Sequence, residues 1–202
     1  MNFLAHLHLA SLANSSFLGN LMADFVRGTP EEQYSAPVAA GIRLHRRIDT
    51  LTDSHPLVRE ARQLFRPEYR RYAPITLDVV WDHFLSLHWS QFEPKTSLTD
   101  FTQHVRTVIE PQLAFTPVKF QELNEFMWPQ RWLIRYQEIP YIGQVLAGMA
   151  KRRPKLAALR ETNQDFTDNY QSLEKIFFRF YPQMMDSCLL YTSDAADDLR
   201  AV

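Results

Sequence analysis

Hydrophobic residues recur at intervals of three and four along most of the chain, a pattern that predicts α-helices. The first 28 residues read as two helices separated by a polar break at 14–16, and Gly28 with Pro30 ends the second. Alternating runs of Val, Ile and Thr are scarce, so strands are not expected. We therefore predict an all-α fold, a single-domain helical bundle. Further helices are expected at residues 38–53, 56–66, 76–91, 98–109, 117–127, 130–137, 140–150 and 154–181.

The composition fits one globular domain. The chain has 202 residues, 46% of them hydrophobic, which suffices for one buried core, and no Gly/Ser-rich or Pro-rich linker divides it. We expect this domain to span residues 1–185. Residues 186–202 carry four acids, one arginine and the sole cysteine, Cys188, and are expected to be a disordered or non-native tail.

One cysteine excludes an internal disulfide. With no signal peptide and no apolar run of membrane-spanning length, we expect a cytoplasmic protein that does not enter a membrane.

Charge is concentrated locally rather than overall. The net charge is −1, but residues 43–71 contain eight arginines against four acids. A second basic cluster comprises Lys151, Arg152, Arg153 and Lys155. Both clusters can be solvated helix faces, the usual place for arginine, or docking surfaces for an acidic partner. Nothing resembles a compact nucleic-acid-binding module, so no nucleic-acid partner is expected.

Asp and His residues in apolar segments are the main chemical signal. His45 with Asp49, and Asp78 with Asp82, have i,i+4 spacing, which places each pair on one helix face. Such groups are costly to bury alone, so their convergence would indicate a divalent metal. Several carboxylates with few imidazoles favour Mn, Fe, Zn or Mg. Nearby arginines would bind a phosphate, and Arg46 and Arg47 are the best placed.

Ordinary structural roles compete with this interpretation. His6 and His8 lie two residues apart on a helix and cannot both face one metal. Asp24 could pair with Arg27, and Asp53 and Asp78 could be helix-terminal residues. The other histidines, His55, His88 and His104, are expected to be structural or surface residues. No glycine-rich phosphate loop, HExxH motif or nucleophile elbow is present.

Six segments in order resemble the acyl carrier protein phosphodiesterase family, also called the acyl carrier protein hydrolase family, from Met1 to about Met185. They are NFLAHLHLA, GNLMADFVRG, GIRLHRRIDTLTDSHP, APITLDVVWDHFLS, HWSQF and GMAKRRPKL. The resemblance implies a diverged, all-helical HD phosphohydrolase that depends on a divalent ion, typically Mn²⁺, with Mg²⁺ or Fe²⁺ as alternatives. It implies cleavage of the phosphodiester between 4′-phosphopantetheine and a serine of holo acyl carrier protein. The usual His-Asp order is reversed here, as Asp82-His83.

These arguments together predict a site and a partner. The expected catalytic residues are Asp24, His45, Arg46, Arg47 and Asp49. The expected metal ligands are His6, Asp24, His45, Asp49, Asp82 and His83. Because acyl carrier proteins are strongly acidic, the arginines of residues 43–71 are the first choice for a docking face. Two alternatives stay open: a metal-dependent phosphohydrolase acting on a small phosphoester or nucleotide, and a non-catalytic helical protein that binds acyl carrier protein. The oligomeric state cannot be predicted from the sequence.

Overall fold

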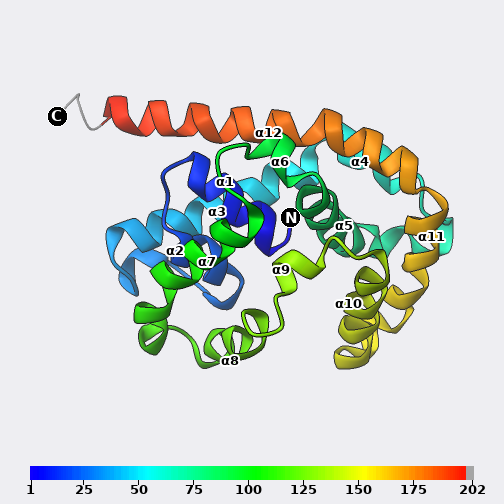
Figure 1. Ribbon diagram of the computed structural model, residues 1–202, viewed down its shortest axis with the longest axis horizontal. Helices are drawn as coiled ribbons and strands as arrows, with labels where there is room; N and C mark the ends of the chain where they lie inside the picture. The colour runs from blue at the N-terminus through cyan, green and yellow to red at the C-terminus, as the bar shows by residue number, and fades with distance from the viewer. Residues whose placement is uncertain (199–202) are drawn as a thin grey trace.

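The computed structural model describes residues 1–198, and side chains for residues 1–190. Every regular element in that range is helical, which confirms the predicted all-α class (Figure 1). The α-helices are α1 (Phe3–Leu12), α2 (Phe17–Met22), α3 (Ala36–Ser54), α4 (Pro56–Arg62), α5 (Ala73–Leu87), α6 (Trp89–Phe92), α7 (Leu98–Ile109), α8 (Val118–Met127), α9 (Trp132–Arg135), α10 (Ile139–Arg152), α11 (Thr162–Asp168) and α12 (Tyr170–Asp198). The 3-10 segments are η1 (Ala23–Phe25), η2 (Pro30–Glu32), η3 (Pro67–Tyr72), η4 (Glu110–Phe115) and η5 (Pro154–Glu161).

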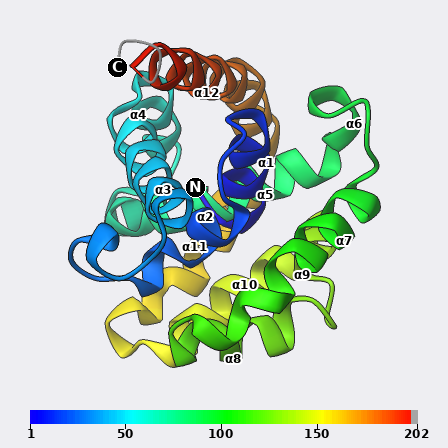
Figure 2. The ribbon, with the colours of Figure 1, turned by 90° about the vertical axis from the view of Figure 1, so that its left-hand side faces the viewer.

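Two buried helices, α1 and α5, form the centre of the molecule. Helix α12 covers one side, and α8 and α10 lie on the opposite side, as two perpendicular views show (Figures 1 and 2). Residues 4–10 of α1 are all buried, so this helix is enclosed all round rather than amphipathic. Helix α5 contributes Trp81 and Phe84, which pack on Phe177 and Phe180 of α12. Polar groups on α1 and α5 therefore need partners within the protein.

Helices α2 and α3 pack at very short range because glycines face each other. A Cβ added at Gly19 would lie 2.3 Å from the carbonyl oxygen of Val38, and one at Gly41 would lie 3.0 Å from that of Ser16. The Ser16 hydroxyl accepts the backbone N–H of Gly19 and so caps α2. The close approach at Gly19 and Gly41 holds α2 against α3, the helix that carries His45.

Several helix boundaries differ from the sequence prediction for identifiable reasons. The expected helix 154–181 is divided into η5, α11 and α12, and the Asn169 side chain at the last break donates to backbone oxygens of Leu64 and Asp165. The expected helix 130–137 shrinks to α9, because Arg131 has φ 53°. Helix α5 begins at Ala73, since Pro74 fits in the first turn of a helix.

The C-terminal segment continues α12. The helix extends through Asp198, and Cys188 is only 2% exposed. Residues 199–202 of the predicted disordered or non-native tail lie outside the described residues, and the predicted origin of the tail stays a prediction. Among the helices of the described part, none is both long and apolar enough to cross a bilayer.

Candidate active site

His6, His45 and Asp49 converge between α1 and α3. Each offers a ligand atom within 4.8 Å of the others. His6 Nε2 lies 3.0 Å from Asp49 Oδ1, and His45 Nε2 lies 3.1 Å from Asp49 Oδ2. The two imidazoles stack with their centroids 3.6 Å apart and their planes within 14°. One carboxylate therefore receives two histidines from different helices, as the i,i+4 spacing predicted for His45 and Asp49.

His45 is oriented by the backbone of α2. Its Nδ1–H donates to the carbonyl oxygen of Asn20 at 2.7 Å, since a carbonyl can only accept. Nε2 is then directed towards Asp49 and, at 3.3 Å, towards Oδ1 of Asp24. A backbone acceptor behind the ring is the usual means of fixing a ligand histidine. Sequence reasoning missed this role of Asn20, which no motif identifies.

The cluster is strongly polarised. Burial alone would lower the pKa of His45, but hydrogen bonds to Asp24 and Asp49 outweigh it and raise the pKa to about 9. Burial and the neighbouring charge of His45 lower the pKa of His6 to about 3. Burial opposes ionisation of Asp49, yet hydrogen bonds from both histidines hold its pKa well below the usual range. His45 thus holds a proton at Nε2 between the carboxylates of Asp24 and Asp49, and this position also suits a cation.

Asp78 belongs to the same polar region. The amino group of Met1 lies 2.7 Å from Asp78 Oδ1 and 3.3 Å from Asp49 Oδ1. The side chains of Asp78 and Asp24 line the same cavity, which is described below. The i,i+4 spacing to Asp82 draws attention to Asp78 in the sequence, but Asp78 is not among the predicted metal ligands.

Asp82 and His83 are not brought into the cluster. Asp82 is fully buried and accepts the backbone N–H groups of Leu4 and Ala5 at 2.7 and 2.9 Å, so it caps α1 from the side of α5. Burial raises its pKa to about 7 despite these bonds. His83 donates from Nδ1 to the carbonyl oxygen of Tyr136, and its Nε2 meets the hydroxyl of Tyr170. Both are engaged elsewhere, so neither stays in our proposed ligand set.

The two arginines beside His45 point away from the cluster. Arg46 donates to the carbonyl oxygens of Gly28 and Val26, and so braces the loop after η1. Arg47 lies near Cys188 of α12, where its charge opposes the rise in the thiol pKa that burial causes. Positions one and two residues after His45 on a helix face other directions. The structure therefore does not support the prediction that Arg46 or Arg47 binds the phosphate.

A cavity of about 720 Å³ opens beside the cluster. Its carboxylates are Asp24 and Asp78, and the amino-terminal residues Met1, Asn2 and Phe3 also line it. Its four cations come from three segments: Arg27, Lys119, and the consecutive residues Arg152 and Arg153. Of these, Arg152 and Arg153 belong to the second basic cluster of the sequence, whereas Lys119 had no sequence signal. The lining thus combines four cations, which suit an anion, with two carboxylates.

The arginines of residues 43–71 do not surround this cavity. Most have partners within the chain: Arg62 pairs with Asp53 and Arg66 with Asp165, both at 2.8 Å. Arg43 pairs with Glu31. These contacts stabilise α3, α4 and η3 locally. Of the two basic clusters, only the second contributes side chains to this cavity.

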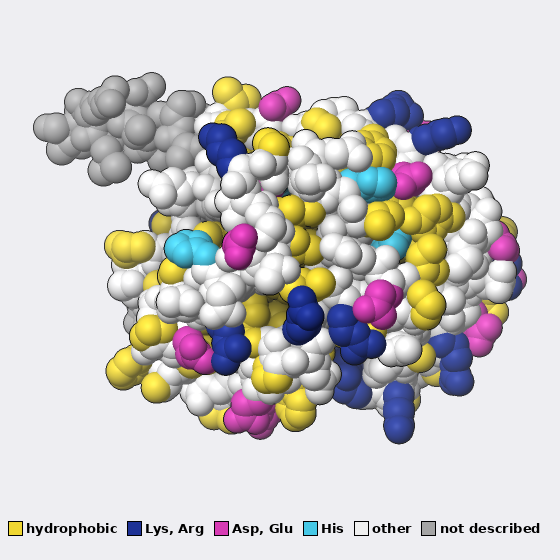
Figure 3. All heavy atoms as spheres, viewed as in Figure 1, with side chains coloured by type: hydrophobic (Ala, Val, Ile, Leu, Met, Phe, Trp, Pro, Cys, Tyr) yellow, Lys and Arg dark blue, Asp and Glu magenta, His cyan; other side chains and the backbone are white. Residues whose placement is uncertain are grey.

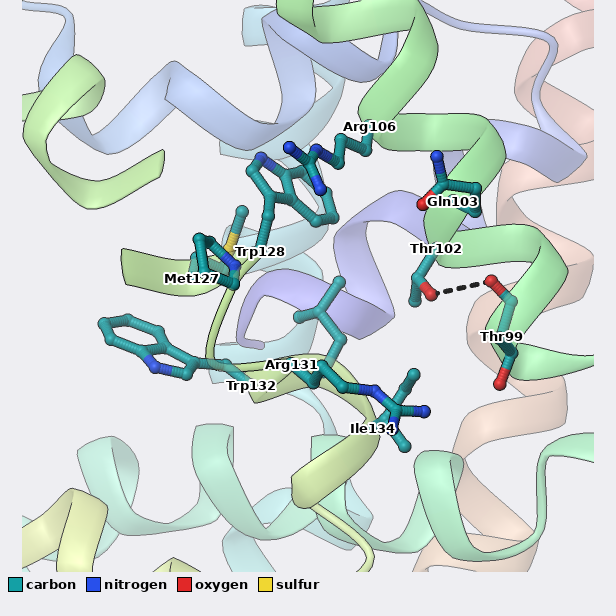
Figure 4. Close-up of a pocket in the computed structure, with 11 residues that line it drawn as sticks. Thr99, Thr102, Gln103, Arg106, Met127, Trp128, Arg131, Trp132 and Ile134 are labelled. Atoms are coloured by element: carbon teal, nitrogen blue, oxygen red, sulfur yellow. Dashed lines mark hydrogen bonds between the residues drawn. The ribbon is translucent and has the colours of Figure 1, made fainter. Parts of the chain in front are cut away.

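A smaller pocket of about 270 Å³ lies between α7 and the segment joining α8 to α9 (Figure 4). Arg106, Trp128 and Trp132 line it, and Thr102 donates a hydrogen bond to the Thr99 carbonyl oxygen at 3.0 Å. None of the clustered Asp and His residues contributes to it. This pocket is therefore separate from the candidate site.

Comparison with known proteins identifies the family. The sequence profile described as "Acyl carrier protein phosphodiesterase" matches residues 1–184. A protein of that name from Photorhabdus laumondii is 61% identical over 186 residues, covering 92% of this chain and 94% of the relative. One from Yersinia enterocolitica is 59% identical over 185 residues, covering 92% and 96%, and one from Escherichia coli is 56% identical over 186 residues, covering 92% and 96%. No solved structure gives a significant match. The chain belongs to the acyl carrier protein phosphodiesterase family.

Proposed function

We propose that this protein hydrolyses the phosphodiester between 4′-phosphopantetheine and a serine of holo acyl carrier protein. The products are the apo protein, with its serine hydroxyl restored, and free 4′-phosphopantetheine. One observation supports this most strongly: the cavity lined by Arg27, Lys119 and other cations is also lined by Asp24 and Met1, which contact His45 and Asp49 of the cluster. Family membership supports the same reaction, because the relatives are named for it.

We propose that His6, His45 and Asp49 hold a divalent cation, with Asp24 next to His45 at the border of this site. The donor set fits, since two imidazole nitrogens and a carboxylate oxygen already meet within ligand range. Mn²⁺ is our first choice, with Mg²⁺ or Fe²⁺ as alternatives. Such an ion would polarise a phosphoryl oxygen and lower the pKa of the attacking water.

The remaining steps belong to the side chains that line the cavity. Arg27 and Arg152 bind the phosphodiester oxygens and stabilise charge that develops on them. The Asp24 side chain is 70% exposed and receives a hydrogen bond from His45, which lowers its pKa. Ionised at neutral pH, Asp24 orients the attacking water and accepts its proton.

The acidic substrate protein docks around the cavity mouth. Lys and Arg side chains gather near α9 and α10 on the face shown in Figure 3. Arg152 and Arg153, at the end of α10, are exposed and line the cavity. Positive charge at the mouth steers an acidic protein so that its modified serine meets the cluster.

The direct test is the intact mass of holo acyl carrier protein after incubation with the purified protein. With Mn²⁺ we expect the mass of the prosthetic group to be lost, and with EDTA we expect it to be retained. A second arm uses small phosphodiesters and nucleotides. Turnover of these without loss of mass from holo acyl carrier protein would favour the small-phosphoester alternative, and no turnover of either would favour a non-catalytic binding protein.

A further inference from the structure

A second hollow, of about 420 Å³, lies between α8 and α10. In contrast to the cavity beside the cluster, its walls are largely aromatic and aliphatic, and we call it the apolar groove. Its lining includes Phe25, Phe126, Trp132 and Met149, with Gln130 and Gln144 as polar members. Phe126 is 52% exposed, so this face offers apolar surface to solvent. Contiguous exposed apolar surface beside a polar site marks a place where a ligand binds.

The apolar groove adjoins the cavity. Five residues line both: Phe3, Phe25, Lys119, Met149 and Arg152. The two shared cations therefore stand at the junction of an anion-binding chamber and an apolar channel. A ligand that fits the whole space has a phosphate at one end and a slender, mostly neutral chain extending away from it.

The proposed substrate has this shape. Its phosphate is joined to the pantetheine arm, an unbranched chain apart from a gem-dimethyl group, with a hydroxyl, two amides and a terminal thiol. The gem-dimethyl group and methylenes would lie against Phe25 and Met149, and the amides have partners in Gln130 and Gln144. The serine on the other side of the phosphate faces the cavity mouth, near Arg153.

We propose that the apolar groove between α8 and α10 binds the pantetheine arm of the substrate. This inference rests on the proposed function, because it assumes that the phosphate of the arm occupies the cavity. It assigns a specificity role to residues that lie outside the Asp and His cluster. Binding energy from this part of the substrate, remote from the reacting bond, would place the phosphorus at the cluster.

Gly148 allows a test that leaves the cluster unchanged. It lies on α10 in the wall of the groove, and the nearest atom to an added Cβ would be Arg152 Nη1 at 3.8 Å, an ordinary contact. Gly148→Leu therefore narrows the groove without a backbone clash. Ala147→Leu, at the neighbouring exposed position of α10 that does not line the groove, is the matched control. Thermal unfolding and Mn²⁺ binding of both variants report whether the fold and the cluster are intact.

The measurement is kcat/KM on holo acyl carrier protein, together with binding of free pantetheine in EDTA, followed by tryptophan fluorescence, to which Trp132 in the groove contributes. We expect Gly148→Leu to lower kcat/KM by about tenfold or more and to abolish pantetheine binding, with Ala147→Leu close to the wild type. Equal kcat/KM values for the two variants would overturn the proposal while leaving the proposed function intact. Loss of only acylated substrates in Gly148→Leu would also overturn it, since the groove would then hold the acyl chain.

If the wild-type protein cleaved no holo acyl carrier protein, the proposed function would fail separately. Pantetheine binding would then decide the inference alone. Saturable binding to the wild type that is lost in Gly148→Leu would uphold the groove as an arm-binding site. Absence of binding to the wild type would reject it.

Discussion

At the scale of single residues, Asp49 organises the candidate site. It accepts hydrogen bonds from His6 and His45 on different helices and also contacts the Met1 amino group. The sequence predicted part of this arrangement, because i,i+4 spacing placed His45 and Asp49 on one face. The same rule placed Asp78 and Asp82 together, but it could not tell which element that face would meet. In the structure Asp82 meets the first turn of α1.

The proton held by His45 would make the proposed metal binding dependent on pH. Because its pKa is about 9, His45 is protonated at neutral pH and must release that proton when a cation binds to Nε2. We expect the apparent affinity for Mn²⁺ to rise about tenfold per pH unit up to about pH 9. Calorimetry in two buffers of different ionisation enthalpy should detect about one proton released. An affinity that is constant between about pH 6 and 8 would contradict the assignment of His45.

Removal of Asp82 should affect stability rather than metal binding. Asp82→Ala leaves the buried N–H groups of Leu4 and Ala5 without an acceptor, at a cost of about 3 kcal/mol. For a protein of this size, the melting temperature should fall by about 6–12 °C. Calorimetric titration of the folded variant with Mn²⁺ should give the wild-type affinity. A large loss of affinity with little change in melting temperature would restore Asp82 to the ligand set.

At the scale of elements, the site depends on how closely α2 and α3 pack. The end of α2 supplies the Asn20 carbonyl oxygen that orients His45, and this distance is set by the facing glycines. Hydrophobic periodicity predicted both helices but not their separation. Periodicity also failed where single residues end helices, as at Arg131 with its positive φ. Such breaks depend on tertiary contacts that no local pattern contains.

Gly19→Ala tests this packing. Replacing glycine within a helix ordinarily stabilises by about 1 kcal/mol, but here the new Cβ would lie 2.3 Å from the Val38 carbonyl oxygen. Overpacking costs about 3 kcal/mol or more, so the clash outweighs the gain in propensity. We expect a melting temperature lower by about 4–8 °C and a weaker affinity for Mn²⁺. Gly148→Ala, with no such contact, is the control and should not be destabilised.

At the scale of the whole molecule, charge and shape indicate where the substrate protein approaches. Cations from three separate segments meet at the cavity, and only the fold brings Arg27 to the same place as Arg152. The sequence identified both basic clusters but ranked residues 43–71 first, and these arginines do not line the cavity. Intramolecular ion pairs, such as that between Arg66 and Asp165, distinguish them in the structure.

Charge reversal at the cavity mouth should slow the capture of the substrate protein. For Arg153→Glu we expect kcat/KM on holo acyl carrier protein to fall about tenfold at low salt, mainly through slower association. The defect should shrink as ionic strength rises, because exposed charges are screened. Arg59→Glu, on the exposed face of α4, is the matched control and should behave like the wild type. A larger defect for Arg59→Glu would return docking to residues 43–71.

The central claim is that the His6, His45 and Asp49 cluster performs phosphodiester hydrolysis on holo acyl carrier protein. The most direct measurement compares Asp49→Asn with Asp53→Asn, one turn further along α3, by intact mass of the substrate over time with Mn²⁺. Loss of a residue that hydrogen-bonds to a metal ligand typically lowers metal affinity or activity about 10–100-fold. Removal of the central carboxylate should therefore reduce kcat/KM by at least about 100-fold. Asp53 is exposed and forms an ion pair with Arg62, outside the cluster, so Asp53→Asn should retain near wild-type activity. Full activity in a folded Asp49→Asn variant would contradict the account.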